Sequence, residues 1–284
     1  MSLPSISIVN FSATAEDEVQ RAVRAVNRQI VEDFLPIWGA GRTLRLYAPS
    51  FDAARTRHVA EEPIPGDGVL YLVNEASLPG ALGYHDTNAA ALPVGFVFVL
   101  DPNDWTVTLS HEALELIVDP NVNLLVPGPD PRKATRTVLH AYEVCDAVER
   151  TSYQIDGVTV SNFVTPAYFA AGNNKGARND FLGVGVSSFG VSPKSHMSFF
   201  DPKTWKFVTF TGEKPSKVKP LAERAQRCDH PKPQRPSEEK LRAVLEKHRA
   251  KSRSAGRAGA RLRGITRAGR YAALETGTPP VDIS

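Results

Sequence analysis

The stretch Ser110-His111-Glu112-Ala113-Leu114-Glu115 decides how this chain is interpreted. Around it, apolar residues recur at helical spacing from Val107 to Val118, and proline at Asp119-Pro120 then prevents the helix from continuing. Residues i and i+4 of a helix project from one face, about 6 Å apart, so His111 and Glu115 can bind one metal ion together. The stretch therefore predicts a metal site on a helix.

Glu112 is rotated away from the line that joins His111 and Glu115, toward the place where a metal-activated water would lie. This is the arrangement of H-E-x-x-H metal hydrolases, with a carboxylate in place of the second histidine. The residues predict a divalent metal with Glu112 as the general base of water attack on a carbonyl. The alternative is a helix with a buried histidine that is hydrogen-bonded to an acid.

The residues before this helix predict a sheet and one further helix. Thr14 is the expected N-cap of that helix, whose apolar residues follow at helical spacing as far as Phe34, and Gly39 and Gly41 stop it. Alternating or fully apolar runs predict the strands. These are expected at 6–10, 43–48, 68–74 and 95–100, with a short edge segment at 81–87.

The residues after the metal-binding helix predict a different set of elements. A Pro/Gly loop is expected at 126–131, followed by a helix at 133–142. A hairpin with its turn at Asp156-Gly157 is expected over 152–164. A last strand pair is expected around 197–200 and 205–210.

The sequence resembles the zincin superfamily of metallopeptidases over roughly residues 5–120, where a mixed sheet precedes the metal-binding helix in the same order. It looks closest to a bacterial and phage group with the signature S-H-E-x-x-E-x-x-x-D-P followed by E-x-x-D. Here the second motif is Glu143 with Asp146, and the segments 83–86 and 161–163 are also similar to that group. The resemblance implies an α/β (α+β) fold, with a zincin-like mixed sheet and an active-site helix.

The resemblance also implies the rest of the ligand set. Glu143, 28 residues after Glu115, would be the third ligand, and Asp146 would orient His111, or these two roles would be reversed. Asp119 lies on the same helical face as His111 but about 12 Å along the axis, at 1.5 Å per residue, so we expect it to end the helix instead.

The ligand chemistry limits the choice of metal. One neutral imidazole and two carboxylates would neutralise a divalent cation, which we expect to be Zn²⁺, with Mn²⁺ or Fe²⁺ made competitive by the oxygen ligands. The candidate hydrogen-bond donors to an oxyanion are Tyr142, Tyr153 and Tyr168, and the sequence does not choose among them.

Other polar residues are assigned ordinary roles. His85 and His140 are interpreted as loop or surface residues, and Met197 as a packing residue. Cys145 is interpreted as a small buried side chain, since no signature of a cysteine nucleophile surrounds it.

The net charge of +3 conceals an asymmetry between the two parts of the chain. Residues 1–212 contain 16 Lys/Arg and 23 Asp/Glu, whereas residues 213–284 contain 18 and 8, giving net charges of −7 and +10. The second part has one aromatic residue, Tyr271, and cannot bury enough apolar surface to fold. We therefore predict a metal hydrolase domain at 1–212 and a basic, mostly disordered tail at 213–284. The tail would bind nucleic acid non-specifically or an acidic partner, or serve as a linker.

The chain has neither an apolar run near the ~20 residues of a membrane span nor a recognisable signal peptide, so we expect a cytoplasmic or virion-associated protein with no membrane contact. Its expected function is that of a metallopeptidase that acts on a peptide or protein substrate, which would lie along the edge segment at 81–87. The alternative is a catalytically inactive zincin scaffold that serves as a binding or virion-associated module.

Overall fold

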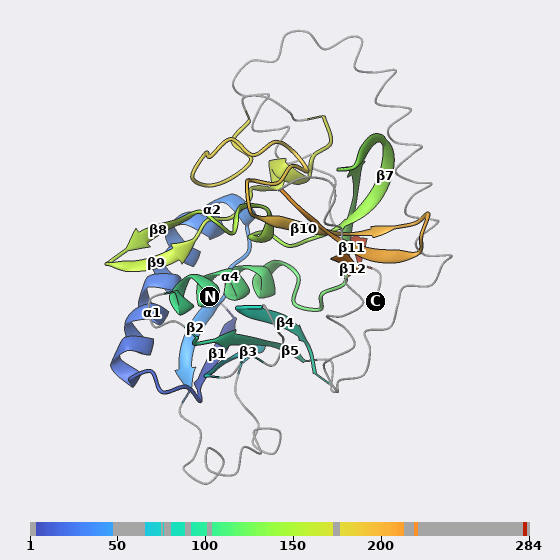
Figure 1. Ribbon diagram of the computed structural model, residues 1–284. Coiled ribbons are helices and arrows are strands. Elements are labelled where there is room, and N and C mark those ends of the chain that lie inside the picture. The colour runs from blue at the N-terminus through green and yellow to red at the C-terminus, as the bar shows by residue number, and fades with distance from the viewer. Residues whose placement is uncertain are drawn as a thin grey trace.

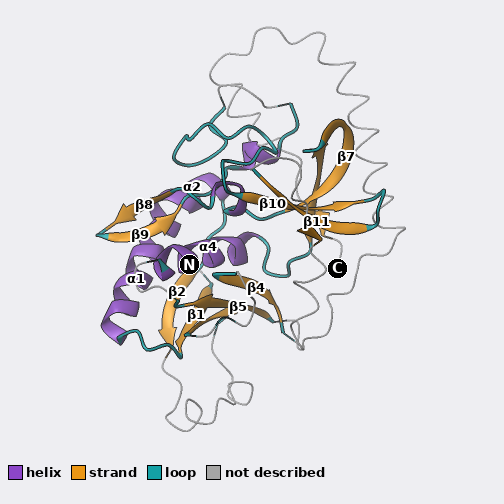
Figure 2. Cartoon of the chain, viewed as in Figure 1, coloured by secondary structure: helices purple, strands orange, loops and turns teal. Residues whose placement is uncertain are grey.

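The computed structural model describes residues 4–47, 66–74, 76, 81–88, 92–100, 104–172 and 177–212, with two short strands at 219–220 and 281–282. This part of the protein is a mixed α/β structure with two larger sheets, a two-stranded hairpin and a central helix, α4 (Trp105–Val118) (Figure 1). α4 lies between the five-stranded sheet and the hairpin (Figure 2). No helix among the described residues is long and apolar enough to cross a bilayer.

The five-stranded sheet has the order β2-β1-β3-β5-β4. Four of its strands run parallel, and β4 pairs antiparallel with β5 at the edge. The nearly continuous apolar sequences of β3 and β5 are typical of parallel strands. The predicted strands and the edge position of the fifth are confirmed. They are β1 (Ser5–Asn10), β2 (Thr43–Tyr47), β3 (Gly68–Val73), β4 (Gly83–Thr87) and β5 (Pro93–Phe98).

The helix predicted between β1 and β2 is present in three consecutive parts. They are α1 (Glu16–Arg28), the π-helical turn η1 (Gln29–Phe34) and α2 (Leu35–Trp38). Gly39 ends α2 in the left-handed conformation, at φ 67°, which glycine adopts without strain.

The predicted N-cap of this helix is wrong. Ala15 holds the cap position, and no side chain caps the helix. Thr14 instead belongs to the preceding turn, where its N–H is donated to the Ser12 hydroxyl and its carbonyl accepts from the Asn10 amide. The helix therefore begins one residue later than the threonine would place it.

The segment after α4 differs from the prediction. The expected loop at 126–131 is the strand β6 (Leu124–Asp130), and the expected helix at 133–142 is the strand β7 (Lys133–Ala141). β7 pairs antiparallel with β6 and with β10 (His196–Asp201), and the β-branched residues of 135–138 favour that pairing over a helix. β6 tolerates two prolines because, among the described residues, its other edge is paired only at 124–125.

The remaining elements confirm the predicted hairpin and strand pair. The turn of the hairpin has positive φ at Asp156 and Gly157, which suits a two-residue connection. The strands are β8 (Ser152–Ile155), β9 (Val158–Ser161), β10 (His196–Asp201) and β11 (Lys206–Thr211), and the short 3₁₀ turns are η2 (Asp146–Val148) and η3 (Pro166–Phe169).

The six-stranded sheet has the order β12-β11-β10-β7-β6-β13. Its outer strands, β12 (Lys219–Pro220) and β13 (Val281–Asp282), fall within the segment predicted as a tail. They pair with β11 and β6, respectively. The other residues of 213–284, on which the predicted disorder and partner binding depend, lie outside the described residues.

A closed triangle of buried hydrogen bonds fixes the position of α4. The Ser110 hydroxyl donates to the Gln29 side-chain carbonyl over 2.6 Å and accepts from the Ser161 N–H over 3.0 Å. The Gln29 amide closes the triangle by donating to the Ser161 carbonyl over 2.7 Å. Because Ser110 directly precedes His111, the triangle also fixes where the predicted metal ligands lie.

We expect Ser110→Ala to lower the free energy of unfolding by about 2–3 kcal/mol, because the Gln29 carbonyl and the Ser161 N–H would be left buried without a partner. Urea unfolding monitored by circular dichroism measures this loss. Thr106→Ala is the matched control: its hydroxyl also links α4 to β9, by donating to the Thr159 carbonyl, but in a half-buried position. It should cost about 1 kcal/mol or less, and an equal cost for both variants would contradict the role of the triangle.

Candidate metal centre

Three predicted site residues converge at the C-terminal half of α4. His111 Nε2 lies 3.1 Å from Glu115 Oε2 and 3.2 Å from Asp146 Oδ1. One donor atom of each residue lies within 4.8 Å of the other two, the spacing of side chains that can bind one ion. The site is buried, with the His111 side chain the most exposed of the three at 14%.

The local chain geometry explains this convergence. His111 and Glu115 are one turn apart on α4, as the sequence predicts. The second oxygen of Glu115, Oε1, accepts the backbone N–H of Cys145 over 3.0 Å, so the loop that carries Asp146 is attached directly to the helix. Cys145 itself is fully buried, in agreement with its interpretation as a small buried side chain.

Glu143 and Asp146 occupy different places in the site. Asp146 contacts His111, whereas Glu143 Oε2 faces His85 Nε2 at 3.7 Å. Of the two role assignments left open by the sequence, the structure thus groups Asp146, and not Glu143, with His111 and Glu115.

His85 is not the loop or surface residue that the sequence suggested. It lies on β4 with a side chain only 4% exposed, and its Nδ1 is 3.3 Å from Glu112 Oε2 and 3.7 Å from Glu115 Oε2. On this short strand His85 and Gly83 share the face toward α4, where a Cβ at Gly83 would lie 2.8 Å from Glu112 Oε1. The helical face of α4 meets β4 here, a long-range contact that no local pattern indicates.

His140 also differs from its prediction. It is buried on β7, where Nε2 lies 2.9 Å from the Pro129 carbonyl oxygen and the ring packs against Phe189. Its contacts are structural, and burial lowers its pKa to about 4.

His196 is a member of the site that sequence reasoning missed. Its Nε2 lies 3.0 Å from Asp146 Oδ2 and its Nδ1 lies 3.3 Å from Glu149 Oε2. The neighbouring Met197 is buried in an apolar cluster with Val138 and Phe199, so its interpretation as a packing residue is confirmed. The contact of β10 with η2 brings His196 to Asp146, 50 residues earlier in the chain, which explains why the sequence gives no signal for it.

Asp119 has the structural role that the helix geometry predicts. It follows α4, and its carboxylate accepts the backbone N–H groups of Asn123 and Leu124, each over 3.1 Å. It therefore ends the helix and starts the turn into β6.

The predicted tyrosines are largely engaged elsewhere. The Tyr153 hydroxyl donates to Asp33 over 2.7 Å, and the Tyr168 hydroxyl donates to the Gly190 carbonyl over 2.8 Å. Tyr142 packs its ring against Trp38 and Phe169, and no residue of the described part pairs with its hydroxyl. Burial raises the pKa of all three hydroxyls, so each remains a neutral donor at ordinary pH.

Three buried acids and one largely buried acid form what we call the carboxylate cluster: Glu112, Glu115 and Asp146, with Glu143. Burial disfavours the charged form of His111, yet Glu115 and Asp146 hold its pKa well above the ordinary value. Burial and the charge of Glu115 raise the pKa of Glu143 well above its usual range. Burial likewise favours neutral Asp146, but His196 and His111 outweigh it and hold that pKa well below the usual range. The cluster thus attracts positive charge strongly.

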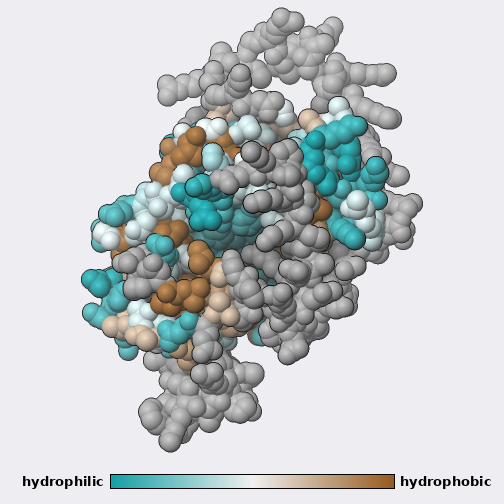
Figure 3. Space-filling model, viewed as in Figure 1, coloured by the Kyte–Doolittle hydropathy of each residue, from teal (hydrophilic) through white to brown (hydrophobic). Residues whose placement is uncertain are grey.

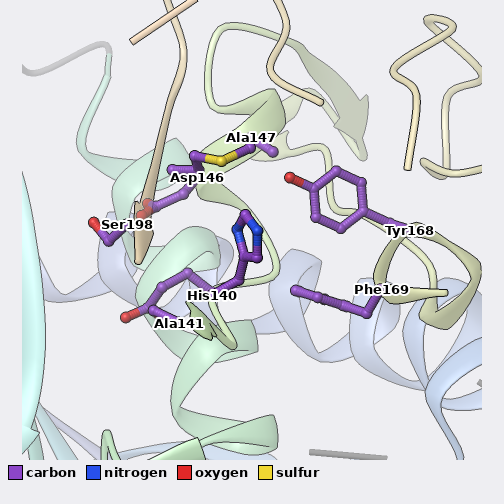
Figure 4. Close-up of a pocket in the computed structure, with 9 residues that line it drawn as sticks. His140, Ala141, Asp146, Ala147, Tyr168, Phe169 and Ser198 are labelled. Carbon is purple, nitrogen blue, oxygen red and sulfur yellow. The ribbon is translucent and has the colours of Figure 1, made fainter. Parts of the chain in front are cut away.

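A small cavity adjoins the carboxylate cluster. Figure 4 shows the His140 ring between Asp146 on one side and Tyr168 and Phe169 on the other, and Glu143 also lines the space. It has room for about one water molecule. In the view of Figure 3, hydrophilic surface gathers between α2 and α4, with apolar patches above and below it. The cavity thus places space for about one water molecule beside Glu143 and Asp146.

Comparison of the sequence with known protein families and with curated proteins gives no match to either. The functional interpretation therefore depends on the residues and their geometry.

The pH dependence of stability tests the charge balance of the site. Asp146 raises the pKa of His196 to about 10, from an ordinary 6.5, with burial opposing and Glu149 adding to the rise. This imidazolium therefore stabilises the metal-free fold fully below pH 6.5, and its contribution is lost as the pH rises through about 10. We expect Tm to fall between pH 7 and 10, and to fall less in His196→Gln. Differential scanning calorimetry of protein from which a chelator has removed metal measures Tm against pH for the wild type and for His196→Gln. If Tm falls equally with pH in the two proteins, the stabilising charge is not on His196.

Proposed function

We propose that this chain is a metal-dependent hydrolase of the zincin type that cleaves peptide bonds. In this proposal His111, Glu115 and Asp146 hold the divalent cation and Glu112 is the general base. The observation that carries the proposal is the convergence of one imidazole and two carboxylates, from α4 and from a separate loop, at 3.1 and 3.2 Å in a buried site.

The donor atoms fit a transition-metal ion. Two ligands that each lie about 2.0–2.2 Å from one ion at the tetrahedral angle are about 3.3–3.6 Å apart. The distances from His111 Nε2 to Glu115 and Asp146 are within a few tenths of an ångström of this separation. One imidazole with two carboxylates suits Zn²⁺, Mn²⁺ or Fe²⁺ and neutralises the charge of the ion. His196 contacts the second oxygen of Asp146, as partners of metal ligands commonly do.

A bound divalent cation would supply a Lewis acid that polarises the substrate carbonyl and lowers the pKa of water at the site. Glu112 then accepts the proton of the attacking water and delivers it to the leaving amine. His85, 3.3 Å from Glu112, orients the carboxylate for this step. Tyr153 and Tyr168 donate their protons elsewhere, so Tyr142 is the one predicted tyrosine left as a candidate donor to the developing oxyanion.

The edge strand β4 supports a peptide as the substrate. β4 is the last strand of the five-stranded sheet and packs against α4, next to the proposed ligands. An extended peptide can add to such an edge through backbone hydrogen bonds, which positions its carbonyl groups without selecting a sequence. His85 and Glu112 mark the place on this edge where cleavage would occur.

Metal binding is tested by His111→Ala. We expect the wild-type chain to bind Zn²⁺ or Mn²⁺ and the variant to bind the ion at this site at least roughly 100-fold more weakly, because one of three protein ligands is lost. Isothermal titration calorimetry, with protein from which a chelator has removed all metal, measures the affinity for Zn²⁺ or Mn²⁺. An unchanged affinity in His111→Ala would exclude this site.

Catalysis is tested by Glu112→Gln. The variant should keep the ion at His111, Glu115 and Asp146. Its rate of peptide hydrolysis should fall by roughly 10²–10⁴-fold, which is the usual contribution of a general base to the rate. The assay follows cleavage of a fluorogenic peptide library. Glu32→Gln is the control, since it makes the same chemical change at an exposed ion pair with Arg28. If Glu112→Gln cleaves at the wild-type rate, Glu112 is not the base; if the wild type binds the ion but cleaves nothing, the chain is a binding module on this scaffold.

A further inference from the structure

We propose a second cation site next to the first, formed by His85 Nδ1, Glu112 and Glu115, with Glu115 shared by the two ions. The second site shares Glu115 with the proposed function, and its effect on hydrolysis rests on that function. Its occupation would remove Glu112 from its role as general base, so that the second ion inhibits hydrolysis.

The geometry defines this site separately from the first. Donor atoms of His85, Glu112 and Glu115 lie within 4.8 Å of one another, as do those of the first group, and Glu115 is the residue common to both. His85 Nδ1 is 3.3 Å from Glu112 Oε2 and 3.7 Å from Glu115 Oε2. These separations bracket the ~3.3–3.6 Å expected of two ligands on one tetrahedral ion.

The other side of the His85 ring provides independent support. His85 Nε2 and Glu143 Oε2 are both buried without a hydrogen-bond partner and face each other at 3.7 Å. An imidazole that binds a cation through Nδ1 carries its proton on Nε2 and usually donates it to a carboxylate. A cation at Nδ1 would therefore direct the Nε2 proton at Glu143, and a small movement would complete that hydrogen bond.

The negative charge of the carboxylate cluster also favours the binding of a second cation. Its four side chains are 3–12% exposed, and among the described residues their ion-pair partners are histidines alone. One divalent cation at the first site would balance the charges of Glu115 and Asp146 and leave Glu112 buried without compensation by a metal, which is costly. A second divalent cation would compensate Glu112 while the histidines remain neutral ligands or donors.

The consequence for activity follows from the chemistry of one side chain. A Glu112 oxygen that is bound to a cation cannot accept a proton from water, so only the chain with a single ion, at the first site, keeps its base. We therefore expect hydrolysis to rise with the first equivalent of Zn²⁺ and to fall as the second binds.

The test counts bound ions. Full-length chain is stripped with a chelator, titrated with ZnCl₂ and examined by native mass spectrometry, in parallel with peptide hydrolysis. The wild type should saturate at two ions per chain. His85→Gln should bind one ion, and its hydrolysis, lowered because His85 also orients Glu112, should no longer be inhibited by excess Zn²⁺. Asp86→Asn is the control, because it removes a half-buried carboxylate from the same strand outside both groups; it should bind two.

Two further variants make the outcomes distinct. Glu112→Gln should also bind one ion, which preserves the test if His85→Gln does not fold by circular dichroism. A wild type that saturates at one ion, lost in His111→Ala, would overturn the second site and leave the proposed function intact. An ion that persists in His111→Ala but is lost in His85→Gln would instead contradict the proposed function and support the site at His85.

Discussion

The central constraint on this structure is the burial of four carboxylates with histidines as their only ion-pair partners among the described residues. Ionised acids are costly to bury unless a positive charge compensates them. Here no lysine or arginine of the described part pairs with Glu112, Glu115, Glu143 or Asp146, and the nearby imidazoles supply that charge. A site that holds protons on its histidines so strongly is also a site that a divalent cation can occupy, because the cation replaces those protons.

The fold keeps this cluster in place from three sides. The Ser110 triangle holds α4 against β9, the Cys145 N–H fixes Glu115 to the following loop, and β4 presents His85 to the same helical face. The ligands therefore lie on packed elements whose positions depend on buried hydrogen bonds. Such support is what a catalytic metal centre requires, because small displacements of a ligand or base are costly to the rate.

Local spacing explains which features could be predicted. The pairing of His111 with Glu115 follows from one helical turn, and the strands before α4 follow from apolar runs of five or six residues. The strand β7 was mistaken for a helix, because its pairing with β6 and β10 is a tertiary effect. The site positions of His85 and His196 could not be predicted for the same reason: tertiary contacts bring His85 to α4 and His196 to Asp146 from distant strands. Glu143 and Asp146 are only three residues apart in an irregular segment, so the sequence could not decide which of them faces His111.

The most direct measurement is a crystal structure of the chain grown with Zn²⁺, with anomalous diffraction recorded at the zinc absorption edge. The account predicts an anomalous peak about 2.0–2.2 Å from His111 Nε2 and from one oxygen each of Glu115 and Asp146. A structure in which His111 remains hydrogen-bonded to Asp146, with no anomalous peak between them at saturating zinc, would contradict it.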